Sequence, residues 1–120
     1  RLRAHVAAEE AARAARDRRA IIRLSGEYHV LLAELSGSTL AARLLHELAS
    51  LTCLIIFLYD APSVPACRDQ EHAEITQALA VGDEAAAIRL MTEHLGHVEA
   101  CLDLSRGTAQ ELDLEAALAG

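Results

Sequence analysis

The stretch IIRLSGEYHVLLAELSGST, residues 21–39, decides the fold of this chain. Its apolar side chains recur every three or four residues, which places them on one face of an α-helix. The Ser and Gly residues at its end are typical of a helix terminus followed by the cap of the next helix. The pattern predicts one helix over residues 17–36 and the start of the next at residue 39.

The rest of the chain repeats this helical pattern. Apolar spacing and capping signals predict further helices over residues 2–16, 39–59, 64–80 and 83–104, and a short last helix over residues 111–119. Because the connections are short, neighbouring helices should run antiparallel. The predicted architecture is all-α, an antiparallel bundle of about five or six helices.

Local signals mark the ends of the later helices. Ser63 is the expected N-cap of the fourth helix, and Pro65 falls early enough to be tolerated in its first turn. Gly82 is expected to end that helix in a left-handed conformation, and Asp83 to cap the fifth.

The composition fits one α-helical domain over residues 1–120, because 52% of the residues are hydrophobic and only 2% aromatic. The charged, Ala-rich helix at residues 2–16 is interpreted as solvated. The apolar run LTCLIIFLY, residues 51–59, is far shorter than the about 20 residues needed to cross a bilayer, so no membrane is expected. We interpret it as a core helix segment, buried between neighbouring helices or in a subunit interface.

Charge and cysteine usage exclude several classes of protein. The formal net charge is −7, which makes close approach to a nucleic-acid backbone unfavourable for this chain alone. Cys53, Cys67 and Cys101 are odd in number and form no CxxC pair, so neither a disulfide framework nor a cysteine zinc site is expected. The first twenty residues hold no apolar signal-peptide core. A cytoplasmic location is the prediction.

Three of the six histidines lie on apolar helix faces. His29 shares a face with Tyr28 and Leu32, and His72 and His94 share faces with apolar residues of later helices. Burying an imidazole without a partner costs about 1–3 kcal/mol, so three inward histidines need partners. A divalent metal would be one such partner, because neutral imidazole is its commonest nitrogen ligand. Separate core histidines, satisfied by backbone or water, fit the pattern equally well.

The residues around these histidines resemble a known family. The segments SGEYHVLLAELSGSTL (residues 25–40) and EHAEITQALAVGDEAAAIRLMTEHLGHVE (residues 71–99) are similar to the effector-binding (FCD) domain of FadR-subfamily, GntR-type bacterial transcription regulators. The resemblance implies a ligand-sensing, dimerising helical domain. It also implies that DNA is bound only through an N-terminal winged helix-turn-helix, which is absent from this chain.

The resemblance also implies a set of site residues. In metal-binding members three histidines, matching His29, His72 and His94, hold a divalent ion together with an Asp four residues before the first. Ser25 stands at that Asp position, where its hydroxyl is expected to bind a metal-bound water or the effector. Many relatives carry an effector-facing Arg in the third helix, where this chain offers Thr52 and Tyr59 as polar groups instead.

The prediction is therefore a homodimeric regulatory domain, not an enzyme, that binds a small carboxylate effector at a Zn, Ni or Mn site. One alternative is a metal-dependent enzyme on a DinB-like helical bundle. Glu71 and Glu93 each precede a candidate ligand by one residue and are expected to point about 100° away from it, which leaves no general base. A second alternative is a dimerisation module with structural histidines.

Overall fold

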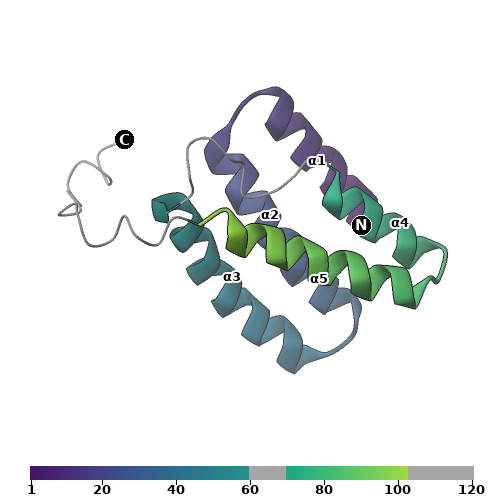
Figure 1. The fold of residues 1–120 in the computed structure, drawn as a ribbon. Coiled ribbons are helices and arrows are strands. Elements are labelled where there is room, and N and C mark those ends of the chain that lie inside the picture. Colours follow the sequence, from purple (N-terminus) through teal and green to yellow (C-terminus); the bar gives the residue numbers. More distant parts are fainter. Residues whose placement is uncertain (60–69, 103–120) are drawn as a thin grey trace.

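The computed structural model describes residues 1–59 and 70–102, and these residues fold into five α-helices (Figure 1). The helices are α1 (Leu2–Ala14), α2 (Arg18–Leu35), α3 (Thr39–Tyr59), α4 (Glu71–Ala80) and α5 (Glu84–Ala100). The predicted all-α bundle is confirmed. The short last helix predicted over residues 111–119 lies outside the described residues.

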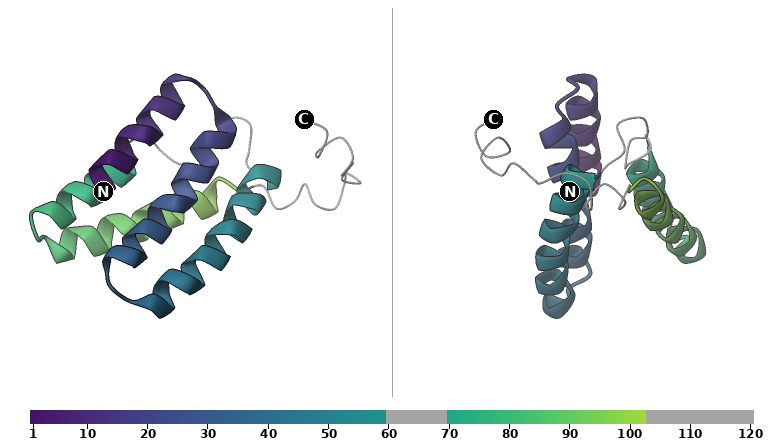
Figure 2. Two further views of the ribbon diagram at one scale, coloured as in Figure 1. Left: turned by 180° about the vertical axis from the view of Figure 1, so that it is seen from behind. Right: turned by 60° about the vertical axis from the view of Figure 1, so that its left-hand side comes forward.

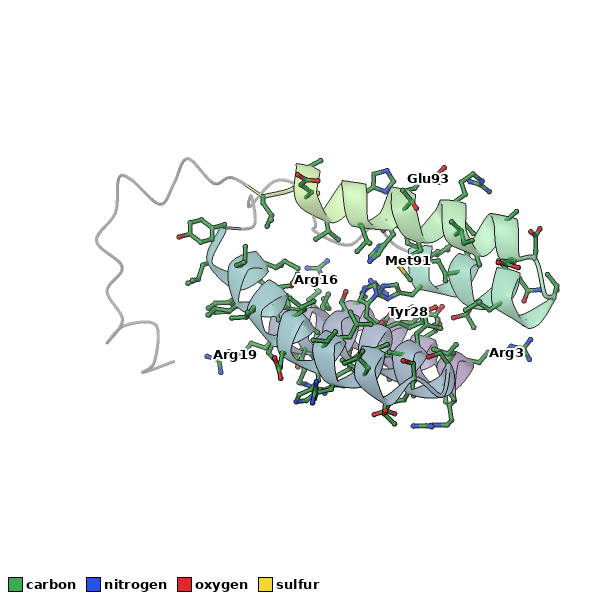
Figure 3. All side chains as sticks on the ribbon, turned by 90° about the horizontal axis from the view of Figure 1, so that it is seen from below. Arg3, Arg16, Arg19, Tyr28, Met91 and Glu93 are labelled. Atoms are coloured by element: carbon green, nitrogen blue, oxygen red, sulfur yellow. The ribbon has the colours of Figure 1, made fainter. Side chains whose placement is uncertain are left out.

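The five helices form two layers. Helices α1, α2 and α3 lie side by side in one layer, with α2 packed against both neighbours, and the α4–α5 hairpin crosses this layer (Figures 1 and 2). Helix α4 also packs against α1. Figure 3 shows Tyr28 of α2 and Met91 of α5 in the space between the layers, whereas Arg3 and Arg19 point outward. This arrangement places the middle of α2 opposite α5.

The turns between helices follow the sequence signals. Gly37 and Gly82 adopt the left-handed conformation, with φ of 78° and 74°. Asp83 caps α5 by accepting a hydrogen bond from the backbone N–H of Ala86, at 2.9 Å. Asp17 caps α2 in the same way, at 3.0 Å from the N–H of Ala20. These predicted helix boundaries are confirmed.

Three helix ends differ from the prediction. Helix α4 begins at Glu71 because Gln70 is left-handed, with φ of 75°, and interrupts a helix that the sequence pattern started at residue 64. The predicted cap Ser63 lies outside the described residues. Helix α1 ends at Ala14, since Arg16 is also left-handed (φ 54°), and α5 ends at Ala100.

The interpretation of residues 51–59 as a buried core segment is wrong for the single chain. Ile56 is the one fully buried residue of α3, and Leu51 is 59% exposed. The reason is that α3 lies at the edge of its layer and packs chiefly against α2. The full helix has 21 residues, and an 18-residue segment of it has a mean hydropathy of 1.7. By length and composition alone α3 could cross a membrane, but the apolar helix of a soluble protein passes the same test.

Candidate metal centre

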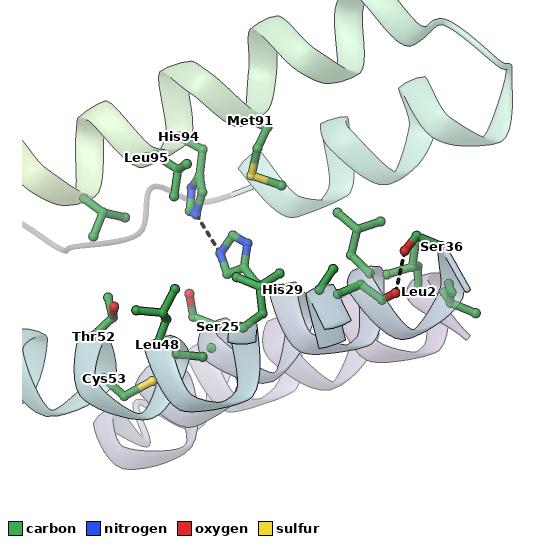
Figure 4. Close-up of a pocket in the computed structure, with 18 of the residues that line it drawn as sticks. Leu2, Ser25, His29, Ser36, Leu48, Thr52, Cys53, Met91, His94 and Leu95 are labelled. Carbon is green, nitrogen blue, oxygen red and sulfur yellow. Dashed lines mark hydrogen bonds between the residues drawn. The ribbon is translucent and has the colours of Figure 1, made fainter. Parts of the chain in front are cut away.

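Three histidines meet between the two layers. His29 comes from the middle of α2, His72 from the first turn of α4 and His94 from α5. The Nε2 atom of His94 lies 3.2 Å from Nε2 of His29 and 3.3 Å from Nε2 of His72, and the three candidate ligand atoms all lie within 4.8 Å of one another. His72 and His94 are buried, with 3% and 1% exposed surface. Figure 4 shows His29 and His94 facing each other across the gap.

Two carboxylates fix the orientation of these rings from behind. Nδ1 of His72 lies 2.9 Å from both carboxylate oxygens of Glu9, and Nδ1 of His94 lies 2.7 Å from Oε2 of Glu71. A carboxylate can only accept, so each Nδ1 must carry the proton and donate it. Each Nε2 is then left with a lone pair directed into the cluster.

The lone pairs determine which partner the cluster can accept. The acceptor nitrogens of His72 and His94, 3.3 Å apart, repel each other unless a cation lies between them. Around a tetrahedral zinc ion with Zn–N distances of about 2.0–2.1 Å, neighbouring nitrogens stand about 3.3–3.4 Å apart. Two of the three donor spacings are close to this value, and the donor set therefore fits a divalent metal ion.

The ionisation of the site favours the metal-binding form. Burial, with smaller contributions from His72 and His94, lowers the pKa of His29 to about 3. Burial also lowers the pKa of His94, although the hydrogen bond to Glu71 partly offsets it. Burial on its own would raise the pKa of Glu71, but hydrogen bonds from His94 and His97 lower it overall. At neutral pH the imidazoles of His29 and His94 are neutral and Glu71 is ionised.

Tyr28 holds His72 from the side. Its ring stacks on the His72 ring with centroids 4.0 Å apart and planes 9° from parallel, and the residue has no exposed surface. Its hydroxyl donates to the carbonyl oxygen of His72 (3.3 Å) and shares a hydrogen bond with the hydroxyl of Thr76 (3.0 Å). Burial raises the pKa of Tyr28, which keeps the hydroxyl protonated. The His72 ring is thus fixed by a stacked ring and a carboxylate.

Sequence reasoning missed both carboxylates. Helix α1 was expected to be solvated, yet Glu9 is 2% exposed, with Nε2 of His5 at 3.6 Å and Nη1 of Arg13 at 3.8 Å from its oxygens. Glu71 does point away from His72, but toward α5, where it binds His94 and His97. The sequence did hold one signal for Glu9: His5 and Arg13 lie four residues before and after it, which places both side chains beside its carboxylate on one face of the helix.

A cavity of about 720 Å³ lies beside the histidine cluster, between α2, α3 and α5. Of the predicted effector-binding residues, Ser25 and Thr52 line it together with His29 and His94 (Figure 4). Tyr59 is not among the lining residues, because it lies beyond Ile56, the last residue of α3 to reach the cavity. The prediction for Tyr59 is thus not supported by the geometry.

Comparison with known proteins identifies the family. The model of the FCD domain matches residues 1–97. The chain belongs to the FCD domain family. This agrees with the resemblance in the sequence and makes the chain a regulatory domain of the kind found in GntR-family transcription regulators. No curated protein and no solved structure matches the chain. In this FCD domain the histidine cluster and every residue that lines the cavity except Val98 lie within the matched residues.

Proposed function

We propose that this FCD domain senses a small carboxylate effector through a divalent metal ion held by His29, His72 and His94. One observation carries the proposal: the three imidazoles converge, and the Nε2 lone pairs of His72 and His94 point inward because Glu9 and Glu71 accept the Nδ1 protons. A bound ion would supply positive charge and open coordination positions for a carboxylate. Of the predicted ions, an all-nitrogen set of protein donors suits Zn and Ni better than Mn, which prefers oxygen ligands.

Ser25 and Thr52 are the proposed polar contacts of the effector. Both line the cavity, and Ser25 lies one helical turn before His29. A hydroxyl is a weak ligand compared with a carboxylate, so Ser25 is assigned to hydrogen bonding of the effector or of water. The cluster then has fewer protein ligands than one that includes an Asp, and more positions remain for the effector.

Signal transmission would use the two layers. The histidines come from α2 in one layer and from α4 and α5 in the other, so an effector bound among them favours one packing of the layers over another. Only a difference in effector affinity between two packings can carry a signal. We assign DNA binding to an N-terminal winged helix-turn-helix outside this chain, in a cytoplasmic FadR-type regulator.

The regulator would act as a homodimer. Large apolar side chains form a stripe along α3 on the face next to the cavity face, and each is at least 40% exposed: Leu40, Leu44, Leu51 and Ile55. Exposed apolar stripes of this kind mark interaction surfaces. A second copy packed against this stripe would cover it and would account for the apolar composition of α3.

A metal-dependent enzyme is the less favoured function. The two carboxylates nearest the cluster, Glu9 and Glu71, are both bound to histidine Nδ1 atoms. Neither is therefore directed to the open side of the cluster, where a general base would have to stand.

Metal analysis of protein purified without a His-tag tests the proposal. We expect stoichiometric divalent metal in the parent chain and loss of most of it in His72→Ala and His94→Ala. The exposed His46→Ala is the matched control and should keep its metal. Circular dichroism shows whether each variant is folded. Equal metal content in the parent and the two cluster variants would refute the assignment.

A further inference from the structure

We infer that the effector of this FCD domain is a monocarboxylate with an apolar chain or ring, and not a polyacid or a sugar acid. The inference rests on the proposed function, because the histidine cluster is taken to receive the carboxylate. It adds what the rest of the effector must be.

The walls of the cavity exclude a second charge. Within the described part of the chain no Arg, Lys, Asp or Glu lines it. Apolar side chains cover most of its wall on α2, α3 and α5, including Leu32, Leu45, Leu48, Met91, Leu95 and Val98. A second carboxylate placed against these side chains would lose its hydration without gaining a partner. An alkyl chain or ring placed there would leave water for apolar contacts.

The polar groups of the cavity gather near the histidines. Ser25 and Thr52 lie close to His29 and His94, whereas the hydroxyl of Ser36 lies toward the other end (Figure 4). That hydroxyl donates to the carbonyl oxygen of Ala33 at 2.6 Å, so its proton is already used. The thiol of Cys53 likewise donates to the carbonyl oxygen of Ile22, at 3.3 Å. Few donors remain for the many hydroxyls of a sugar acid.

The charge balance of the cluster points the same way. Glu9 and Glu71 stand directly behind His72 and His94. A divalent ion and Arg13, whose Nη1 lies 3.8 Å from Glu9, carry three positive charges against the two negative charges of Glu9 and Glu71. One positive charge remains, which balances a single carboxylate and leaves none for a second anionic group. The cavity of about 720 Å³ falls in the range of about 300–1,000 Å³ that small-molecule sites occupy. A single carboxylate attached to an apolar body therefore matches both the apolar walls of the cavity and the charge of the cluster.

Titration calorimetry with three simple acids tests this inference on the zinc-loaded protein. Octanoate carries one carboxylate and an apolar chain, octanedioate has the same length with a second carboxylate, and acetate has no chain. We expect octanoate to bind at least about tenfold more tightly than either of the others, because each buried methylene adds to the affinity. Protein stripped of metal with EDTA should bind octanoate at least about tenfold more weakly.

A pair of variants tests whether the alkyl chain of octanoate binds in the cavity. Leu48 lines the cavity and is 55% exposed, whereas Leu54 on the same helix is 54% exposed and does not line it. Leu48→Gln should lower the affinity for octanoate several-fold and leave the affinity for acetate unchanged. Leu54→Gln should change neither affinity. Both side chains are on the surface, so neither variant should unfold the domain.

The outcomes separate this inference from the proposed function. If metal is bound but octanedioate or acetate binds as tightly as octanoate, the inference is wrong and the proposed carboxylate sensor stands. Octanoate binding that is equal with and without metal would also overturn it, because the carboxylate would then not be anchored at the histidines. A protein that binds no metal removes the proposed function and the inference together.

Discussion

Glu9 and His72 are 63 positions apart in the chain, yet both carboxylate oxygens of Glu9 lie 2.9 Å from Nδ1 of His72. The contact joins α1 to α4 and is buried on both sides, with exposed fractions of 2% and 3%. It fixes the tautomer of a candidate ligand from a helix that contributes no ligand of its own. The position of α1 is therefore coupled to the histidine cluster.

The first prediction concerns this carboxylate. Glu9→Gln keeps the shape of the side chain but removes its charge, so the His72 imidazole becomes a poorer and less well oriented ligand. We expect zinc affinity to fall about 10–100-fold. Competition with a chromogenic chelator measures it. Glu10→Gln is the control, because Glu10 is the adjacent, exposed glutamate. Equal affinities in the two variants would show that Glu9 does not act on the ligand.

The second prediction is a pH dependence of the metal-free domain. The pKa of His29 is about 3 in the folded protein and 6.5 in a model peptide. Between these pH values the His29 side chain binds more protons in the unfolded chain than in the folded one. The contribution of His29 to the free energy of unfolding is therefore complete above about pH 6.5 and is lost as the pH falls toward 3. Urea denaturation in EDTA at pH 7 and pH 5 should show the loss. His29→Gln, which cannot take up that proton, should reduce the difference, and an unchanged difference would contradict the prediction.

How much of the fold could be predicted depends on how local each signal is. The helix boundaries at Asp17, Gly37, Gly82 and Asp83 were predicted correctly, because caps and left-handed glycines act over a few residues. The start of α4 was not, because nothing nearby in the sequence indicates that Gln70 adopts a left-handed conformation. Likewise, an apolar helix such as α3 has the same composition in a core and at an exposed edge.

The candidate metal centre also combines local sequence patterns, which could be predicted, with long-range contacts, which could not. His29, His72 and His94 each lie on an apolar stripe, a local pattern, and the structure brings all three together. Glu9 lies among alanines, which are apolar on several faces of the helix, so the sequence does not indicate which face is buried. Its burial depends on the packing of α1 against α4, a long-range contact that the periodicity of α1 does not encode.

The third prediction concerns the stripe on α3. Replacing Leu44 and Leu51 together by Glu places charges in the proposed dimer interface, where they would be desolvated without partners. Light scattering coupled to size exclusion should show a dimer for the parent chain and a monomer for the double variant. Ile88→Glu is the control, because Ile88 is 60% exposed on α5 and lies outside the stripe. A monomeric parent chain would refute the interface.

The fourth prediction concerns the contact between α2 and α3 that positions one wall of the cavity. A Cβ added at Gly26 would stand 2.6 Å from Sγ of Cys53 and 3.6 Å from Cβ of Ala49, so Gly26→Ala forces the helices apart and should destabilise the domain by about 1–3 kcal/mol. Cys53→Ala should relieve part of this loss in the double variant, because it removes the sulfur.

Gly96 is the matched control: among the described residues nothing lies within 4 Å of a Cβ added there. Gly96→Ala in α5 should therefore stabilise the domain by about 0.5–1 kcal/mol through helix propensity. Urea denaturation of the parent chain and the three variants gives these values. Equal effects of Gly26→Ala and Gly96→Ala would show that the two helices are not in close contact at Gly26.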